Sequence, residues 1–268
     1  MSAGSCPAAD PIDVEWLRAA SGLATVEVLA EATSTMDRGR EIAASAAARL
    51  PAAVIAERQT AGRGRRGAAW WQPPGSLAVS LVIDGAAWGA EARPIWSLAC
   101  GVALAETLRT LEPSVAAVVR WPNDVEAGGR KLAGILVEAA TGGRAVFGIG
   151  VNTTGASASA PEPLRPRVVT LPDLTGRPLA RQRLLAALMP RLIDLLAADA
   201  AVLAARYRPL CGLTGKLVRV YVGDVIHEGT CRGVADDGGL VVATATDTVV
   251  IRSGSLTAPG SEWRGAGG

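Results

Sequence analysis

The chain has 268 residues, of which 49% are hydrophobic and 19% charged, and its net charge is +2. This length suffices for one large domain with a small second one. The near-neutral charge argues against a dedicated nucleic-acid binder. The single histidine argues against His-rich zinc sites and a Ser-His-Asp triad. Four distant cysteines, the lack of a signal peptide and the lack of an apolar stretch long enough to span a membrane indicate a cytoplasmic protein.

Apolar periodicity predicts a mixture of strands and helices over most of the chain. After a tail that we expect to be disordered over residues 1–15, a short helix is predicted around Trp16 and Leu17. Strands are predicted over residues 25–35, 52–59, 76–84, 115–121, 131–140 and 144–152. Helices are predicted over residues 37–50, 95–111 and 179–208, and residues 153–178 are expected to form a long loop rich in Pro and Ser. Because strands and helices do not alternate strictly, the pattern favours an α+β fold.

The pattern changes after Gly212. Four short strands are expected over residues 216–222, 225–235, 239–244 and 248–253, joined by tight turns. Such spacing predicts a small all-β barrel. We therefore place a boundary between a main domain over residues 16–211 and a small domain over residues 212–268.

The segment GRGRRG at Gly62–Gly67 carries the strongest chemical signal. Its glycines allow the backbone to approach a ligand closely, and its arginines offer bidentate donors for a phosphate or a carboxylate, so it predicts an anion site. A Walker A loop is excluded because Ala68 and Ala69 follow where Lys and Ser or Thr are required. The dinucleotide fingerprint fits poorly because Pro73-Pro74 forbid the helix that should hold a pyrophosphate. A solvated basic loop is the alternative.

Residue types that this chain rarely uses mark further positions. It has 25 arginines but only two lysines and two asparagines. Asn123 and Asp124 follow Pro122 on a rigid turn. Lys131 opens one apolar strand and Asn152 closes another. A lysine ammonium suits an acyl or phosphate oxygen, whereas the alternatives are ordinary turn residues and a solvated strand end.

Six segments occur in a fixed order: ATSTMD, ERQTAGRGRRGAAW, PPGSLAVSL, RWPND, RKLAGILVE and GIGVN, followed by the β-rich tail. In this order they resemble the biotin protein ligases, over roughly residues 30–260. The resemblance implies an α+β fold with a mixed sheet like that of class II aminoacyl-tRNA synthetases, with helices on one side, and a small SH3-like β-barrel at the C-terminal end.

The resemblance also implies a two-step reaction. Biotin and ATP, with Mg²⁺ on the phosphates, would form biotinyl-5′-AMP and pyrophosphate, and the adenylate would then acylate one lysine of the biotin-carrier domain of a carboxylase. This chemistry needs cations around a carboxylate and a phosphate, and it needs no enzyme nucleophile.

Matching positions carry the family's roles onto this sequence. Lys131 is expected to hold the biotin carboxylate and the α-phosphate, and Arg65 to restrain the adenylate, so both are expected to be catalytic. The biotin-binding residues implied are Ser34, Thr35, Met36, Gln59, Arg63, Gly64, Arg65 and Lys131. The ATP-binding residues implied are Arg65, Trp70, Asn123, Asp124, Lys131 and Asn152. Trp70 would pack on adenine, and the sequence does not indicate the metal ligands.

Three positions depart from the family pattern. Met36 stands where the family has asparagine, Ala68 where an arginine is usual, and Arg120 where a lysine is usual. In addition, only 33 residues precede Ser34, which is too few for a helix-turn-helix. We therefore expect a ligase with no DNA-binding function, with neither DNA nor a membrane as a partner.

Three alternatives stay open. One is a lipoate or other acyl-adenylating protein ligase on the same fold. Another is a nucleic-acid-binding module that uses the arginines with Trp70 and Trp71 as stacking platforms. The last is a catalytically weak biotin sensor, because of Met36 and Ala68. The combination of GRGRRG with KLAGIL favours the biotin ligase.

Overall fold

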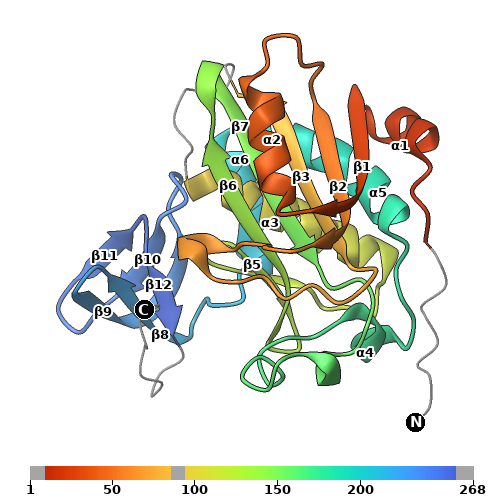
Figure 1. Ribbon diagram of the computed structural model, residues 1–268. Helices are drawn as coiled ribbons and strands as arrows, with labels where there is room; N and C mark the ends of the chain where they lie inside the picture. The colour runs from red at the N-terminus through yellow and green to blue at the C-terminus, as the bar shows by residue number, and fades with distance from the viewer. Residues whose placement is uncertain (1–9, 86–93, 258–268) are drawn as a thin grey trace.

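The computed structural model describes residues 10–85 and 94–257 and arranges them around two β-sheets, the second at one side of the first (Figure 1). The larger sheet has seven strands in the order β1-β2-β3-β7-β6-β5-β4. Their bounds are β1 Thr25–Ala32, β2 Ala52–Gln59, β3 Leu77–Asp84, β4 Val118–Arg120, β5 Asp124–Ala127, β6 Arg130–Ala139 and β7 Arg144–Val151. Because β1 is parallel to β2 while the other neighbours are antiparallel, the sheet is mixed, and the predicted α+β fold is confirmed.

Helices cover both faces of this sheet. Their bounds are α1 Val14–Ser21, α2 Thr35–Ala44, α3 Pro94–Leu111, α4 Leu171–Thr175, α5 Arg181–Leu196 and α6 Ala200–Tyr207. In Figure 1, α3 and α5 pack together behind the sheet and α1, beside β1 at its edge, packs against α5, whereas α2 lies in front of the sheet against β2, β3 and β7. The expectation of helices on one side only is therefore wrong. None of the helices within the described ranges has the length and apolar character needed to cross a membrane.

Side-chain alternation along the strands explains the two covered faces. In β2, Ala53 and Ile55 belong to the main core, while Ala52 and Val54 belong to a second buried cluster beneath α2. Successive side chains of a strand point to opposite faces, so a strand with no polar break is buried on both. This is why residues 52–56 read as a continuous apolar run.

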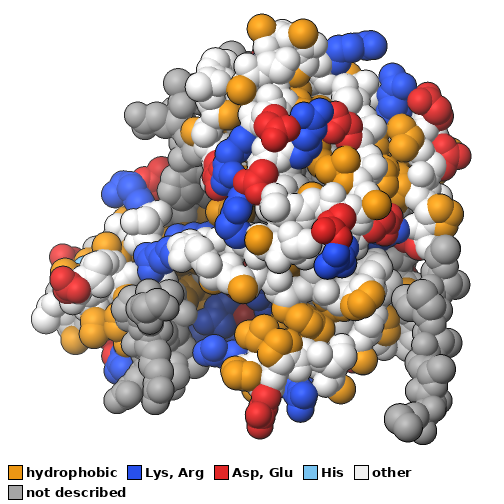
Figure 2. Space-filling view, viewed as in Figure 1, with side chains coloured by type: hydrophobic (Ala, Val, Ile, Leu, Met, Phe, Trp, Pro, Cys, Tyr) orange, Lys and Arg blue, Asp and Glu red, His pale blue; other side chains and the backbone are white. Residues whose placement is uncertain are grey.

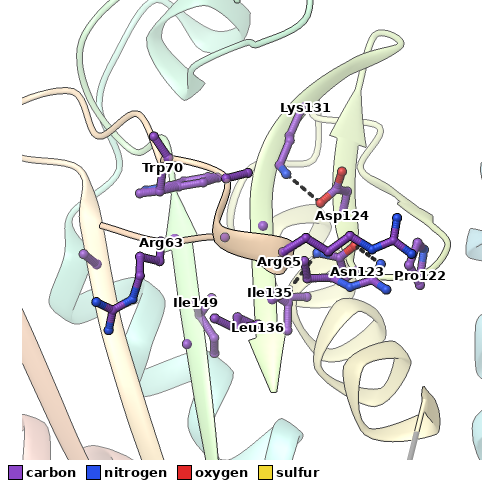
Figure 3. Close-up of a pocket in the computed structure, with 18 of the residues that line it drawn as sticks. Arg63, Arg65, Trp70, Pro122, Asn123, Asp124, Lys131, Ile135, Leu136 and Ile149 are labelled. Atoms are coloured by element: carbon purple, nitrogen blue, oxygen red, sulfur yellow. Dashed lines mark hydrogen bonds and ion pairs between the residues drawn. The ribbon is translucent and has the colours of Figure 1, made fainter. Parts of the chain in front are cut away.

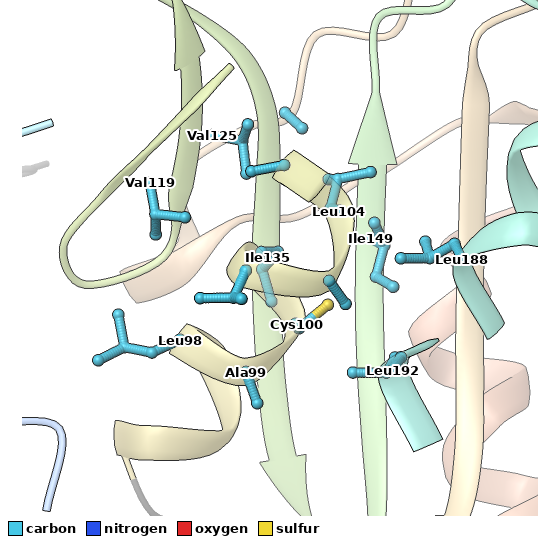
Figure 4. Close-up of a cluster of buried hydrophobic side chains, with 14 of the residues drawn as sticks. Leu98, Ala99, Cys100, Leu104, Val119, Val125, Ile135, Ile149, Leu188 and Leu192 are labelled. Carbon is cyan, nitrogen blue, oxygen red and sulfur yellow. The ribbon is translucent and has the colours of Figure 1, made fainter. Parts of the chain in front are cut away.

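The main core lies between the sheet and α3 with α5. Figure 4 shows Leu98 and Leu104 of α3 and Leu188 of α5 packed against Ile135 of β6 and Ile149 of β7. All five side chains are almost completely buried. This packing fixes the back of β6 and β7, so their front faces can serve as a rigid floor.

The first helices differ from the sequence prediction. Asp10 accepts a hydrogen bond from the backbone N of Arg181 at 2.8 Å, and α1 begins at Val14 after the N-cap Asp13. Disorder over residues 1–15 is therefore wrong for residues 10–15, and residues 1–9 lie outside the described part. The helix expected over residues 37–50 begins earlier, because Ser34 caps it, and ends at Ala44.

The region after β7 is also more regular than predicted. The expected loop over residues 153–178 contains α4. The single helix expected over residues 179–208 is two helices, α5 and α6, with Pro190 accommodated inside α5. The segment before α4 pairs with β6, since Val169 N donates to Lys131 O at 2.9 Å.

The second sheet has five antiparallel strands in the order β11-β10-β9-β8-β12. Their bounds are β8 Leu217–Val222, β9 Val225–Val234, β10 Leu240–Ala243, β11 Thr248–Ile251 and β12 Ser255–Thr257. The sequence predicted the first four and missed β12, which is too short to show a pattern. β12 pairs with β8 at the edge of the sheet that faces the larger sheet's cavity.

Candidate active site

A cavity of about 420 Å³ lies between the front of the larger sheet, the arginine-rich segment and the second sheet. Figure 2 shows Lys and Arg side chains gathered in a hollow between the two sheets. The predicted site residues that line the cavity are Ser34, Thr35, Met36, Gln59, Arg63, Gly64, Arg65, Trp70, Asn123, Asp124 and Lys131. The structure therefore brings together all the predicted positions except Asn152.

One end of the cavity is formed by the start of α2 and the end of β2. Ser34 is the N-cap of α2 and is buried. Thr35 N donates to Gln59 Oε1 at 2.9 Å, and Ser80 Oγ donates to Thr35 Oγ1 at 2.8 Å. These hydrogen bonds fix small polar groups in a buried place, which suits a neutral polar ligand group.

Met36 occupies this same end and packs against the floor. Its side chain is buried, and a Cβ added at Gly148 would come within 2.7 Å of its sulfur. Gly148 therefore leaves the room that the long Met36 side chain fills. Where the family pattern has a polar asparagine, this chain has the apolar Met36, which belongs to the buried cluster beneath α2.

The segment Gly62–Ala69, named here the arginine loop, folds back on itself. Gly64 N donates to Ala68 O at 2.7 Å, and Trp70 N donates to Gly62 O at 2.9 Å. Arg66 has φ +56°, the only left-handed residue other than glycine in the described ranges. The loop is thus a defined turn held by its own backbone, with its arginines directed outward from it.

The first two arginines of the loop point in different directions (Figure 3). Arg63 forms an ion pair with Asp37 of α2. Burial alone would raise the pKa of Asp37, but hydrogen bonds from Arg63 and Thr33 hold it below its ordinary value. This contact anchors the loop to α2.

Arg65 points across the cavity instead. Its Nη1 donates to Asn123 Oδ1 at 3.3 Å and to Gly254 O at 3.4 Å. Burial, together with the nearby Arg66, lowers the pKa of Arg65, while Asp124 counteracts both. A half-buried guanidinium without a bonded carboxylate is a ready partner for an anionic ligand.

The turn after β4 and the start of β6 supply the remaining polar groups. Asn123 is fixed by two hydrogen bonds with the backbone of Ile135, both 2.9 Å long. Lys131 Nζ lies 2.7 Å from Asp124 Oδ1 (Figure 3). Asp124 therefore holds the ammonium of Lys131 at the cavity wall.

Trp70 lies flat against two glycines of the floor. A Cβ at Gly150 would come within 2.5 Å of its indole ring, and one at Gly134 within 2.9 Å. These glycines are paired across β6 and β7. Lys131 Nζ lies 5.5 Å from the centre of the ring, within the range of a cation–π contact. The glycines of KLAGIL and GIGVN thus make room for an aromatic platform.

Asn152 does not reach the cavity. It is buried, and its Nδ2 donates to Val169 O at 2.9 Å while its backbone N donates to Leu132 O at 3.0 Å. It therefore fastens the end of β7 to β6 and to the segment before α4. The nucleotide contact expected for Asn152 has no support in this position.

Several cavity residues were not predicted. Arg120 Nη1 donates to Glu126 Oε1 at 3.0 Å, and both line the cavity, as do Arg167, Ser255 and Leu256. Arg120 was noted only as a departure. The last three lie in a loop and a very short strand, so the sequence offers no pattern by which to find them.

The site has an end where fixed polar groups lie beside the buried Met36, a cationic end and an aromatic platform, on a mixed sheet covered by helices. These features define a protein that binds a ligand with an apolar part and an anionic part, with cations where negative charge gathers. A solvated basic loop does not describe this arrangement, because Arg65 is half-buried in the cavity wall and donates to Asn123.

Comparisons with known proteins agree with this class. The sequence profile of the Biotin/lipoate A/B protein ligase family matches residues 28–153. The biotin–[acetyl-CoA-carboxylase] ligase of Mycobacterium tuberculosis is 36% identical over 92% of this chain and 95% of its own length. The bifunctional ligase/repressor BirA of Escherichia coli is 35% identical over 71% of this chain and 61% of its own length.

The fold leads to the same family. The structure of the biotin protein ligase from Aquifex aeolicus in complex with biotin and ATP matches with a TM-score of 0.76 and 25% identity, covering 87% of this chain and 98% of that one. The chain belongs to the biotin protein ligases, within the biotin/lipoate A/B protein ligase family.

Proposed function

We propose that this protein activates biotin with ATP and transfers the biotinyl group to one lysine of a carboxylase's biotin-carrier domain, as a biotin–[acetyl-CoA-carboxylase] ligase. A biotin carboxylate oxygen attacks the α-phosphorus of ATP, which forms biotinyl-5′-AMP and releases pyrophosphate. The lysine amine of the carrier then attacks the acyl carbon, an amide bond forms, AMP leaves, and the amine loses a proton.

The observation that carries this proposal is the convergence of Lys131 and Arg65 on one cavity. Asp124 holds Lys131, and Asn123 holds Arg65, although Lys131 and Arg65 belong to different elements. Negative charge develops on the carboxylate and phosphate oxygens during adenylate formation, and fixed cations stabilise it without reorganising. No nucleophilic side chain is required.

The remaining residues fit the two halves of the intermediate. Ser34, Thr35 and Gln59 present fixed polar groups at the end of the cavity where Met36 packs, which suits the polar head of biotin beside its apolar ring. Trp70 offers a flat face for adenine. Arg63 and Gly64 belong to the arginine loop that closes one wall of the cavity.

Mg²⁺ is the usual partner of the ATP phosphates, and the cavity has carboxylates that fit it. Asp124 and Glu126 both line the cavity, but no group of three or more His, Cys, Asp or Glu that could hold a metal occurs among the described residues. Mg²⁺ is commonly held by one or two carboxylates together with substrate phosphates. Asp124 and Glu126, which also pair with Lys131 and Arg120, are the carboxylates of the cavity that would hold it, and the ion would neutralise phosphate charge.

The carboxylase carrier domain is the protein partner in this proposal, and the cytoplasm is the compartment. Three cysteines of the described part, Cys100, Cys211 and Cys231, are free thiols. Free thiols are typical of a reducing compartment.

We also propose that the second sheet is an SH3-like barrel forming a small domain over residues 212–268. The support is the connection between β11 and β12, which lie at opposite edges of the sheet. The step from Ile251 to Ser255 spans at most about 14 Å, whereas the edges of a flat five-stranded sheet would be about 19 Å apart. The sheet must therefore curl.

Incubation of the protein with biotin, ATP, Mg²⁺ and a carrier-domain fragment tests the function. We expect the mass of the fragment to increase by one biotinyl group, and pyrophosphate to form before the carrier is added. Omission of ATP is the control, and lipoate in place of biotin tests the nearest alternative. Carrier that stays unmodified with biotin but is modified with lipoate would contradict the proposal.

A further inference from the structure

The arginine loop makes two hydrogen bonds to the second sheet. Arg65 Nη1 donates to Gly254 O at 3.4 Å, and Arg66 Nη1 donates to Ser255 Oγ at 2.5 Å. Both acceptors lie 189 positions from their donors in sequence. Ser255 and Leu256 also line the cavity directly. The second sheet therefore forms part of the wall that the loop closes.

The acceptors on this wall are rigidly placed. Ser255 pairs with Tyr221 of β8, and a Cβ added at Gly254 would come within 2.8 Å of Val220 and 2.9 Å of the Tyr221 carbonyl. The backbone at Gly254 thus lies tight against β8. Its carbonyl and the neighbouring Ser255 hydroxyl cannot follow the loop if the loop moves away.

The second sheet is in turn fixed to the floor of the cavity. Trp121 Nε1, next to the Pro122-Asn123 turn, donates to Gly238 O at 3.0 Å, and Gly212 N donates to Val119 O of β4 at 2.9 Å. Hydrogen bonds therefore connect the second sheet's turn at Gly238 and the segment before β8 to β4 and the turn after it, while the loop is bonded to Gly254 and to Ser255 of β12. The anchor for the loop is the same body that carries Asn123.

Arg66 has a backbone conformation that needs such support. A left-handed φ is uncommon for a residue with a side chain and costs free energy unless surrounding contacts maintain it. Arg66 is exposed, and its guanidinium donates a hydrogen bond to the Ser255 hydroxyl. The hydroxyl of Ser255 is well placed to select this conformation.

We propose that Ser255 is a positioning residue for adenylate retention: its hydroxyl holds Arg66, and with it the arginine loop, in the closed form over the cavity. This proposal rests on the function given above. Opening the loop breaks the Arg66–Ser255 hydrogen bond, so the bond slows release of the adenylate into solvent. The second sheet thereby takes part in keeping the activated intermediate for the carrier.

The test compares Ser255→Ala with Ser255→Thr and Ser253→Ala. Ser253 is exposed and does not line the cavity, so it is a matched control with the same chemical change on the same segment. Release of preformed biotinyl-5′-AMP is followed by dilution into unlabelled ligand. We expect about tenfold faster release from Ser255→Ala, equivalent to ~1.4 kcal/mol, as loss of a hydrogen bond to a charged group predicts. Ser255→Thr should restore slow release.

A second measurement does not depend on the enzymatic function. Trypsin cleaves after arginine, so cleavage within the arginine loop of the unliganded protein reports how often the loop opens. We expect faster cleavage there in Ser255→Ala only. Unchanged cleavage and release in Ser255→Ala, or an equal increase in Ser253→Ala, would overturn the positioning role. If the parent makes no adenylate but cleavage rises in Ser255→Ala alone, the proposed function fails and the loop contact stands.

Discussion

Lys131 is one of two lysines in a chain with 25 arginines, and its ammonium is held at the cavity wall by Asp124. The other lysine, Lys216, is exposed and outside the cavity. An arginine would place a larger, planar group where a compact charge lies beside the Trp70 ring. The geometry thus gives a reason for the rare residue type at this position.

Replacing Lys131 by alanine should reduce adenylate synthesis by at least about 100-fold, because a fixed cation at the developing charge contributes on that scale. Pyrophosphate release with biotin and ATP measures the effect. Lys216→Ala is the matched control and should keep the parental rate. Lys131 is partly exposed, so the variant should retain the circular dichroism of the parent. Pyrophosphate release at the parental rate from Lys131→Ala would show that the assigned role is wrong.

Substitution of Gly150 tests whether the Trp70 ring rests on the floor of the cavity. In Gly150→Ala the new Cβ would meet the indole within 2.5 Å, so the ring must leave the floor, at a cost of about 1–3 kcal/mol in the free energy of unfolding. The same change in a Trp70→Ala background should cost less than about 0.5 kcal/mol, because the clash is gone. Urea unfolding of the four proteins gives the coupling. Equal costs in both backgrounds would mean that Trp70 does not rest on Gly150.

Short sequence motifs predicted most of the site, because the residues of each motif are neighbours in sequence and line the same part of the cavity. GRGRRG, RWPND and KLAGIL all line the cavity, as expected from their residue types. Contacts between distant segments could not be predicted in this way. Ser255 is an ordinary residue of a three-residue strand, and its contact with Arg66 exists only because the two sheets meet. Asn152 had the right type and order, but it follows the end of β7, and its side-chain amide donates to Val169 O instead of lining the cavity.

At the scale of elements, continuous apolar runs predicted β2, β3, β6 and β7 well, because buried strands have few polar breaks. The parallel pairing of β1 with β2 could not be read from the sequence, since it depends on α2 crossing in front of the sheet. The short helix α4 was hidden in a Pro-rich segment. Its N-terminal hydrogen bonds, rather than apolar periodicity, define it.

Those hydrogen bonds lead to a prediction about pH. Asp173 accepts from Thr170 N at 2.9 Å and from Ser157 N at 3.1 Å. Burial alone would raise the pKa of Asp173, but these bonds keep it below its usual value. A carboxyl with a lowered pKa in the folded state stabilises that state above the pKa of the unfolded chain, near ~4, and the benefit is lost as pH falls through the folded-state pKa.

Asp173→Asn should therefore lower the free energy of unfolding at pH 7 by about 0.5 kcal/mol, a modest value because the side chain is exposed. The difference from the parent should begin to shrink as pH falls to about 4 and should vanish only below the folded-state pKa of Asp173, which lies lower. Asp199→Asn is the control, because Asp199 is an N-cap without a side-chain hydrogen bond. Urea unfolding from pH 3 to 7 measures both. A difference that is constant over this range would exclude the titration of Asp173 as its cause.

At the scale of the whole molecule, the two sheets share one hydrophobic core. Trp121 of the larger sheet's turn, Tyr207 of α6 and Val220 of β8 belong to the same buried cluster. Trp121 is 1% exposed and its indole N–H reaches Gly238 of the second sheet. Independent domains usually meet through smaller, more polar interfaces. The cluster indicates that the sheets unfold together, although the sequence changes its pattern near residue 212.

The parent should consequently show one unfolding transition in urea, with coincident midpoints by far-ultraviolet circular dichroism, which reports both sheets, and by tryptophan fluorescence. Trp121→Ala should lower the free energy of unfolding by about 3–5 kcal/mol, since it leaves a large cavity between the sheets, and should separate the two midpoints. Trp16→Ala is the matched control: Trp16 is 45% exposed, so its loss should change stability by less than about 0.5 kcal/mol. Two separate transitions in the parent itself would contradict a shared core. Residues 212–268 would then be an independently folding unit. The contact between Arg66 and Ser255 would in that case join two separately stable bodies.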